Sequence, residues 1–137
     1  MNDVEPRYTI EEAAQRTGIS AHTLRYYERI GLLEPIGRMA SGHRRYTDSD
    51  IGLVEFLTCL RQTGMPIRQM QRFMELARAG DGTIAARVDA LVEHRAALSE
   101  QLALLHRHFE ALTRKIEYYR GLLTEHDTEH EHVKENV

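Results

Sequence analysis

The sequence predicts a mainly α-helical protein, in which a winged helix-turn-helix unit is followed by one long helix that self-associates. Two observations carry this prediction. Two short capped helices separated by a glycine precede a segment rich in Gly and Arg, which is typical of a helix-turn-helix followed by a wing. Apolar residues then recur with heptad spacing over residues 88–123, which is typical of a coiled coil.

The first two helices have recognisable start and stop signals. Thr9 begins a capping box that opens a helix over about 10–16, and Gly18 ends it. Ser20 caps the next helix, which ends before Gly31. Two short helices joined by a turn that contains glycine form a helix-turn-helix pattern, although many helical proteins contain that pattern.

The segment 32–46 predicts the wing. It contains Pro35, Gly37 and Gly42, residues that favour turns over helices. We expect two short strands around a turn here.

Two further helices complete the first domain, which we place at residues 1–80. A second capping box opens a helix over about 48–63, and Gly64 ends it. Pro66 stands near the first position of a helix that runs to about 79. The glycines of segment 79–82 predict a hinge between this domain and the rest of the chain.

A dimerisation helix is predicted over residues 81–123. Its apolar seam combines one series that recurs every seven residues with a companion series at the complementary positions: Val88, Leu91, Leu98, Leu102, Leu105, Phe109, Leu112, Ile116 and Tyr119. Arg95 alone interrupts the companion series, and the helix would be ~60 Å long. The alternative is a helix packed on its own domain, but the first half of the chain is too small to cover such a stripe. We therefore expect a homodimer.

The tail, residues 124–137, is polar and acidic, and we expect it to be disordered. Its histidines, His126, His130 and His132, suggest metal binding as an alternative. A solvated tail is the favoured interpretation, because a mobile segment has no surrounding groups to orient imidazole ligands. We predict no metal and no cofactor.

Charge is unevenly distributed along the chain. The net charge is −3, made up of +1 over residues 1–80 and −4 over residues 81–137. Any contact with DNA must therefore be a local patch in the first half. The polar N-terminus and the absence of a long apolar run predict a cytoplasmic protein with no membrane association. The single cysteine, Cys59, excludes an intrachain disulfide.

A dense group of cationic, imidazole and phenolic side chains predicts binding to double-stranded DNA. A recognition helix places some side chains at base edges while neighbouring side chains hold phosphates. The candidate contacts are His22, Thr23, Arg25, Tyr26, Tyr27, Arg38, His43, Arg44, Arg45 and Tyr46. Adjacent helical residues diverge by about 100°, so one of Tyr26 and Tyr27 should face the core. As alternatives, Arg25 pairs with Glu28 along the helix, and the wing arginines are ordinary solvated surface.

These residues resemble the MerR family of transcription regulators. The resemblance covers residues 7 to about 75 and rests on the motifs TLRYYERIGLL and RRYTDSD. It implies a winged helix-turn-helix, a homodimer held by an antiparallel coiled coil, and a pseudo-palindromic promoter spacer that the dimer bends and untwists so that RNA polymerase engages both promoter hexamers. It also implies that Thr23, Arg25 and Tyr26 contact DNA from the recognition helix. Tyr27, Arg44 and Tyr46 match positions that contact the DNA backbone or support the wing.

The absence of further cysteines and of a long C-terminal region limits the kinds of signal to which such a regulator could respond. No cysteine follows Cys59, which argues against the thiolate metal sites of metal-sensing members and against an iron–sulfur cluster. Only 14 residues follow Leu123, so no large ligand-binding domain is expected. The segment FLTCLRQTGMPI resembles the subgroup with a single cysteine that responds to aldehydes, nitric oxide and related electrophiles. The alternative is that Cys59 is a small packing residue.

Other classes of function are weaker. No nucleophile–base pair or phosphate-binding loop indicates an enzyme. A coiled-coil adaptor explains the heptads but not the Arg, His and Tyr residues before position 47. A constitutive repressor, an architectural DNA binder and a regulator of another small molecule remain alternatives.

Overall fold

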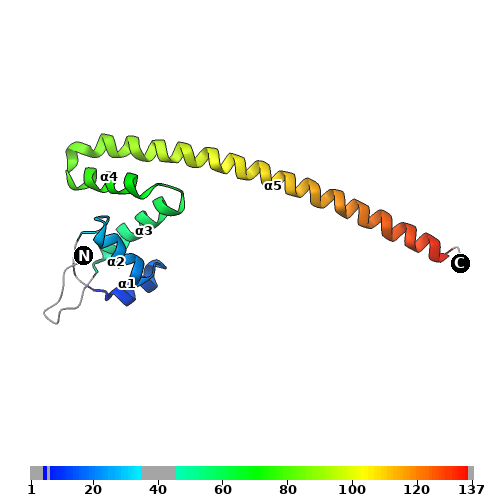
Figure 1. Ribbon diagram of the computed structural model, residues 1–137, viewed down its shortest axis with the longest axis horizontal. Helices are drawn as coiled ribbons and strands as arrows, with labels where there is room; N and C mark the ends of the chain where they lie inside the picture. Colours follow the sequence, from blue (N-terminus) through cyan, green and yellow to red (C-terminus); the bar gives the residue numbers. More distant parts are fainter. Residues whose placement is uncertain (1–4, 6, 35–45, 136–137) are drawn as a thin grey trace. The chain divides into compact units, whose positions relative to one another are not determined.

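The computed structural model describes residue 5, residues 7–34 and residues 46–135. Its elements are five α-helices and a short 3-10 helix: α1 Ile10–Thr17, α2 Ala21–Arg29, α3 Asp48–Gln62, α4 Ile67–Arg78, η1 Asp81–Thr83 and α5 Ile84–Glu135 (Figure 1). The described ranges are thus mainly helical, as predicted. The chain divides into two compact units, Met1–His94 and Arg95–Val137.

The helix-turn-helix is confirmed, with the caps that the sequence predicts. The Thr9 hydroxyl accepts a hydrogen bond from the Glu12 amide at 3.1 Å, which closes the capping box of α1. Gly18 ends α1 with φ 73°, a left-handed conformation that glycine adopts without steric cost. The Ser20 hydroxyl caps α2 by accepting from the Thr23 amide at 3.1 Å. These signals fix where α2 begins and therefore which of its residues face outward.

The helices α3 and α4 also follow their predicted boundaries. The Thr47 hydroxyl accepts from the Asp50 amide at 3.0 Å, and the Asp50 carboxylate accepts from the Thr47 amide at 2.9 Å. Gly64, with φ 98°, lies in the turn after α3. Pro66 is the N-cap residue of α4. The wing predicted for residues 32–46 falls mostly on residues 35–45, which lie outside the described residues.

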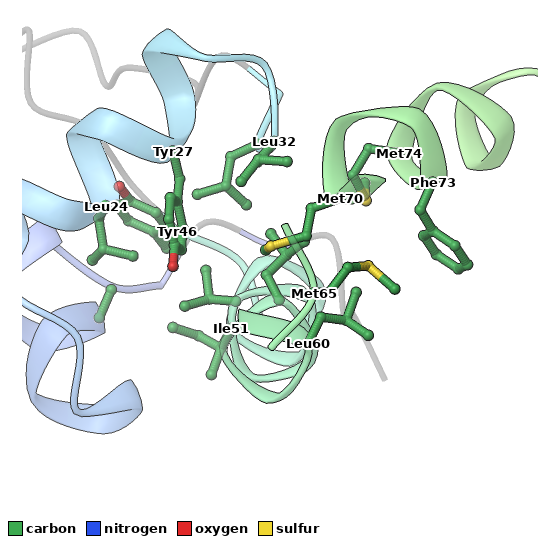
Figure 2. Close-up of a cluster of buried hydrophobic side chains, with 14 of the residues drawn as sticks. Leu24, Tyr27, Leu32, Tyr46, Ile51, Leu60, Met65, Met70, Phe73 and Met74 are labelled. Atoms are coloured by element: carbon green, nitrogen blue, oxygen red, sulfur yellow. The ribbon is translucent and has the colours of Figure 1, made fainter. Parts of the chain in front are cut away.

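The core of the first unit is formed by side chains from α1 to α4 and the adjoining turns. Figure 2 shows how these side chains point toward one another between the helices. The buried apolar cluster consists of Ile10, Ala13, Leu24, Tyr27, Leu32, Leu33, Tyr46, Ile51, Val54, Leu57, Leu60, Met65, Met70, Phe73 and Met74. This core holds α2 by one face and leaves the opposite face free.

Leu57 provides a test of this core. Its side chain is fully buried in α3, so Leu57→Ala should lower the free energy of unfolding by about 2–5 kcal/mol through lost burial and the cavity left behind. The measurement is chemical denaturation. Glu55→Ala, at an exposed position of the same helix, is the matched control and should change the stability by less than about 0.5 kcal/mol. Equal effects of the two substitutions would contradict this packing.

A hydrogen-bonded corner joins α4 to α5 through η1. The Thr83 hydroxyl lies 2.5 Å from the Leu76 carbonyl oxygen, and Arg87 Nη2 donates to the Gly80 carbonyl at 3.1 Å. Gly80 has φ 96°, so the predicted glycine-containing turn is present. The first unit does not end there, because the start of α5 packs on it: Leu91 is partly buried against the core.

The C-terminal segment differs from the disorder predicted for residues 124–137. The helix α5 continues to Glu135, so that prediction was wrong for 124–135. The physical reason is local: no Pro or Gly follows Gly121, and the Glu, His and Lys residues of the tail are compatible with a helix. Polarity alone therefore did not mark the helix end. None of the described helices is long and apolar enough to cross a membrane.

Candidate nucleic-acid interface and adjoining sites

One face of α2 is buried and the other carries the predicted DNA-contacting side chains. Leu24 and Tyr27 are in the core. The exposed residues of α2 are His22, Arg25, Tyr26 and Arg29. They are spaced three and four residues apart, so they share one side of the helix. None of these four is acidic, and the face therefore presents cations and hydrogen-bond donors.

Arg29 also belongs to this face, although it is not among the DNA contacts that the sequence predicts. Its guanidinium carbon lies 5.8 Å from the centroid of the Tyr26 ring. The signal was available in the spacing, since Arg29 follows Tyr26 by three residues and Arg25 by four. Thr23 is partly buried, and its hydroxyl accepts a 3.0 Å hydrogen bond from Ser20. Thr23 is thus placed in the first turn of α2, where the helix begins.

The two adjacent tyrosines take different positions, as predicted. Tyr26 is 37% exposed, whereas Tyr27 is 5% exposed and lies in the core. Tyr46, another candidate contact, is fully buried. For Tyr27 and Tyr46 the structure favours support of the DNA-binding elements over exposed contact with DNA.

Both ends of the segment 35–45 are anchored in the described structure. Leu33 is buried just before it, and Tyr46 just after it forms an antiparallel bridge with Tyr8. The Tyr46 amide donates to the Tyr8 carbonyl at 2.7 Å, and the Tyr8 hydroxyl donates to the Asp48 carboxylate at 2.7 Å. The candidate contacts within the segment lie outside the described residues; they are Arg38, His43, Arg44 and Arg45.

Cys59 lies on α3 with its side chain exposed, one residue before the buried Leu60. Its carbonyl oxygen accepts two hydrogen bonds from Thr63, from the amide at 3.0 Å and from the hydroxyl at 2.7 Å. The same Thr63 hydroxyl lies 2.7 Å from Nε2 of His94 on α5. A hydroxyl has only one proton to donate. When the Thr63 hydroxyl donates it to the Cys59 carbonyl oxygen, the same hydroxyl accepts a hydrogen bond from the Nε2–H tautomer of His94. This links the backbone of Cys59 to α5 through a single side chain.

The apolar stripe of α5 is exposed where it extends beyond the first unit. Leu105, Phe109 and Leu112 are each 64–65% exposed in the isolated chain. The other exposed members of the predicted seam are Val88, Leu102, Ile116 and Tyr119. Leu91 and Leu98 are partly buried, and Leu91 packs on the core of its own chain. A continuous apolar face of this kind marks a protein-interaction surface.

The described residues offer little for metal binding. Among them, no three His, Cys, Asp or Glu side chains are grouped closely enough to hold an ion. The exposed features of the described residues that match the predicted functions are the face of α2, the thiol of Cys59 and the apolar stripe of α5.

Comparisons with known proteins agree with this arrangement. Residues 8–77 match the model of the MerR HTH family of regulatory proteins. An uncharacterised HTH-type transcriptional regulator of Haemophilus influenzae is 39% identical over 113 residues, which span 82% of this chain and 84% of the relative. The regulator AdhR of Bacillus subtilis is 41% identical over 91 residues, which span 66% of this chain and 65% of AdhR. The similarity to AdhR supports the resemblance to the single-cysteine subgroup.

A solved structure shows the same fold. The crystal structure of HiNmlR, a MerR family regulator lacking the sensor domain and bound to promoter DNA, superposes with a TM-score of 0.76 at 39% identity. The match covers 82% of this chain and 90% of HiNmlR. These relatives are transcriptional regulators, and the chain is accordingly a regulator and no enzyme. By its sequence match and its fold, the chain belongs to the MerR family of HTH regulatory proteins.

Proposed function

We propose that this regulator binds a pseudo-palindromic promoter spacer as a homodimer and activates transcription by distorting the DNA, in response to an electrophile or redox signal at Cys59. The observation that carries the proposal is the exposed face of α2. His22, Arg25, Tyr26 and Arg29 lie on this face, and the other face of the helix is buried in the core. An α-helix fits the major groove of B-DNA, where Arg donates to guanine and His and Tyr donate to bases or phosphates. The crystal structure of HiNmlR bound to promoter DNA supports DNA binding by a chain of this fold.

Homodimer formation follows from the apolar stripe of α5. Phe109 and its neighbours expose about two thirds of their surface in one chain, and a second copy is the partner with a matching stripe. A symmetric dimer presents two α2 helices to two half-sites, which explains why the DNA site would be pseudo-palindromic. The seam from Leu102 to Tyr119 would be buried in an antiparallel coiled coil.

DNA distortion is the proposed route to activation. A dimer that holds two half-sites at a fixed separation can bend and untwist the base pairs between them, at a cost that depends on their sequence. Such a change would bring the two promoter hexamers into register for RNA polymerase. The regulator would act in the cytoplasm, with the chromosome.

Cys59 is the proposed sensor. An exposed thiol can add across the C=O bond of an aldehyde: an S–C bond forms, the thiol proton passes to the aldehyde oxygen, and no oxidant is consumed. The adduct would stand on α3 beside the backbone that Thr63 connects to His94 of α5. A change in α3 would thereby reach the dimerisation helix through this contact.

Arg25 provides the test of DNA reading. Arg25→Ala should weaken operator binding by about 10- to 100-fold, because a guanidinium at the centre of the exposed α2 face is lost. The measurement is a gel shift over a series of salt concentrations with the promoter fragment that the wild-type protein protects. Arg107→Ala, at an exposed position of α5, is the control and should bind like wild type.

The gel shift also separates the remaining alternatives. An adaptor with no DNA function would cause no shift at any salt concentration, which would overturn the proposal. A constitutive repressor or architectural binder would bind like a regulator, but no small molecule would change transcription from its promoter. A regulator of another small molecule would respond without Cys59.

A further inference from the structure

The C-terminal end of the recognition helix α2 is held by two side chains from α4. Gln71 Nε2 donates to the Ile30 carbonyl oxygen at 2.8 Å, and Arg78 Nη2 donates to the Gly31 carbonyl oxygen at 2.5 Å. Carbonyls at a helix C-terminus have no partner within the helix, and a cation there also interacts favourably with the helix dipole. The carbonyl groups at the end of α2 thus gain hydrogen-bond donors from side chains that are 41 and 47 positions later in the sequence.

Arg78 also binds the residue that leads into the segment 35–45. Its Nε lies 2.6 Å from the Glu34 carboxylate. One guanidinium therefore holds the Gly31 carbonyl and the Glu34 carboxylate together, using the fixed fork of donors that distinguishes Arg from Lys. Gly31 has φ 82°, so the chain turns sharply between these two anchor points.

Stability alone is a poor explanation for this arrangement. The Arg78 and Glu34 side chains are 35% and 68% exposed, and ion pairs between groups this exposed add little to folding. The buried Leu32 and Leu33 already fix the turn to the core. What Gln71 and Arg78 add is a fixed orientation of the backbone where α2 ends.

We propose that Arg78, assisted by Gln71, is a positioning residue for DNA recognition. It acts through the Gly31 carbonyl at the end of α2 and the Glu34 carboxylate, and it does not itself contact DNA. This inference rests on the proposed DNA binding by α2. A recognition helix held at both ends, by Ser20 at its start and by α4 at its end, keeps its angle in the groove, and operator recognition depends on that angle.

The test compares Arg78→Met with the wild-type dimer on its protected promoter fragment and on an unrelated duplex of equal length. We expect about a tenfold loss of operator affinity, with affinity for the unrelated duplex, the melting temperature and the salt dependence of binding unchanged. Arg78→Lys keeps the charge but not the fork, and it should lose a similar factor. Arg72→Met, at an exposed position of the same helix, is the matched control and should retain the ratio of operator to unrelated affinity.

Each other outcome overturns the inference. A salt slope reduced by about 0.9, with weaker binding to both duplexes, would make Arg78 a phosphate contact. A lower melting temperature with operator affinity retained would make it a stabilising residue only. Unchanged binding by both Arg78 variants would show that the α2 end needs no such support. If the wild-type protein itself bound no promoter, the proposed function would fail, and that result is read independently of Arg78.

Discussion

Phe109→Asp is expected to leave the chain monomeric at micromolar concentration and to reduce operator affinity by about 100-fold or more. Phe109 is 65% exposed in one chain and lies at the middle of the apolar stripe of α5. In a dimer its ring would be buried, and a carboxylate there would have to lose its hydration without a partner. Without the dimer, two α2 helices no longer bind one DNA site together, and the increase in affinity that comes from linking them is lost. Sedimentation equilibrium and gel shift measure the two effects.

The matched control is Ala103→Asp. Ala103 is exposed on α5 one residue after Leu102, at a heptad position away from the seam, so this substitution adds the same charge outside the expected interface. It should leave both the dimer and DNA binding intact. A dimeric Phe109→Asp protein would show that the stripe from Leu102 to Tyr119 does not hold the two copies together.

Cys59→Ser should abolish induced transcription while leaving operator affinity within about twofold of wild type. The substitution replaces sulfur by oxygen at an exposed position of α3, so it removes the reactive thiol with little effect on packing. The Thr63 bonds to the Cys59 backbone remain available in the variant. Transcription in vitro from the protected promoter, with and without formaldehyde, is the measurement.

A control is needed because aldehydes also react with lysine amines. Lys115→Arg removes such an amine from α5 and keeps its charge, and this variant should remain inducible. Induction that survives Cys59→Ser would rule out the thiol as the sensor and favour a regulator that reads another small molecule. Loss of induction in Lys115→Arg alone would move the sensor to α5.

Features encoded by local sequence were predictable. Thr9, Ser20 and Thr47 cap helices through side-chain hydrogen bonds to residues three positions later, and that spacing is visible in the sequence. The different environments of Tyr26 and Tyr27 follow from helical geometry, because adjacent residues diverge by about 100°, although that geometry does not say which of the two is buried.

Features that depend on distant residues were not predictable. The bond between Thr63 and His94 joins residues 31 apart, and Arg78 reaches Gly31 from 47 residues away. No local pattern reports such contacts. The heptad pattern also cannot separate a seam that faces a partner from packing within one chain: Leu91 fits the predicted dimer seam and also packs on the core of its own chain.

The most direct test of the regulatory mechanism is hydroxyl-radical footprinting of the promoter, with the stoichiometry of the complex measured in parallel. Two chains per site should protect two symmetric patches about one helical turn apart on one face of the duplex, with enhanced cleavage between them where the DNA is distorted. Three results would contradict a dimer that binds two half-sites and distorts the spacer: a single protected patch, one chain per site, or uniform protection with no enhanced cleavage at the centre.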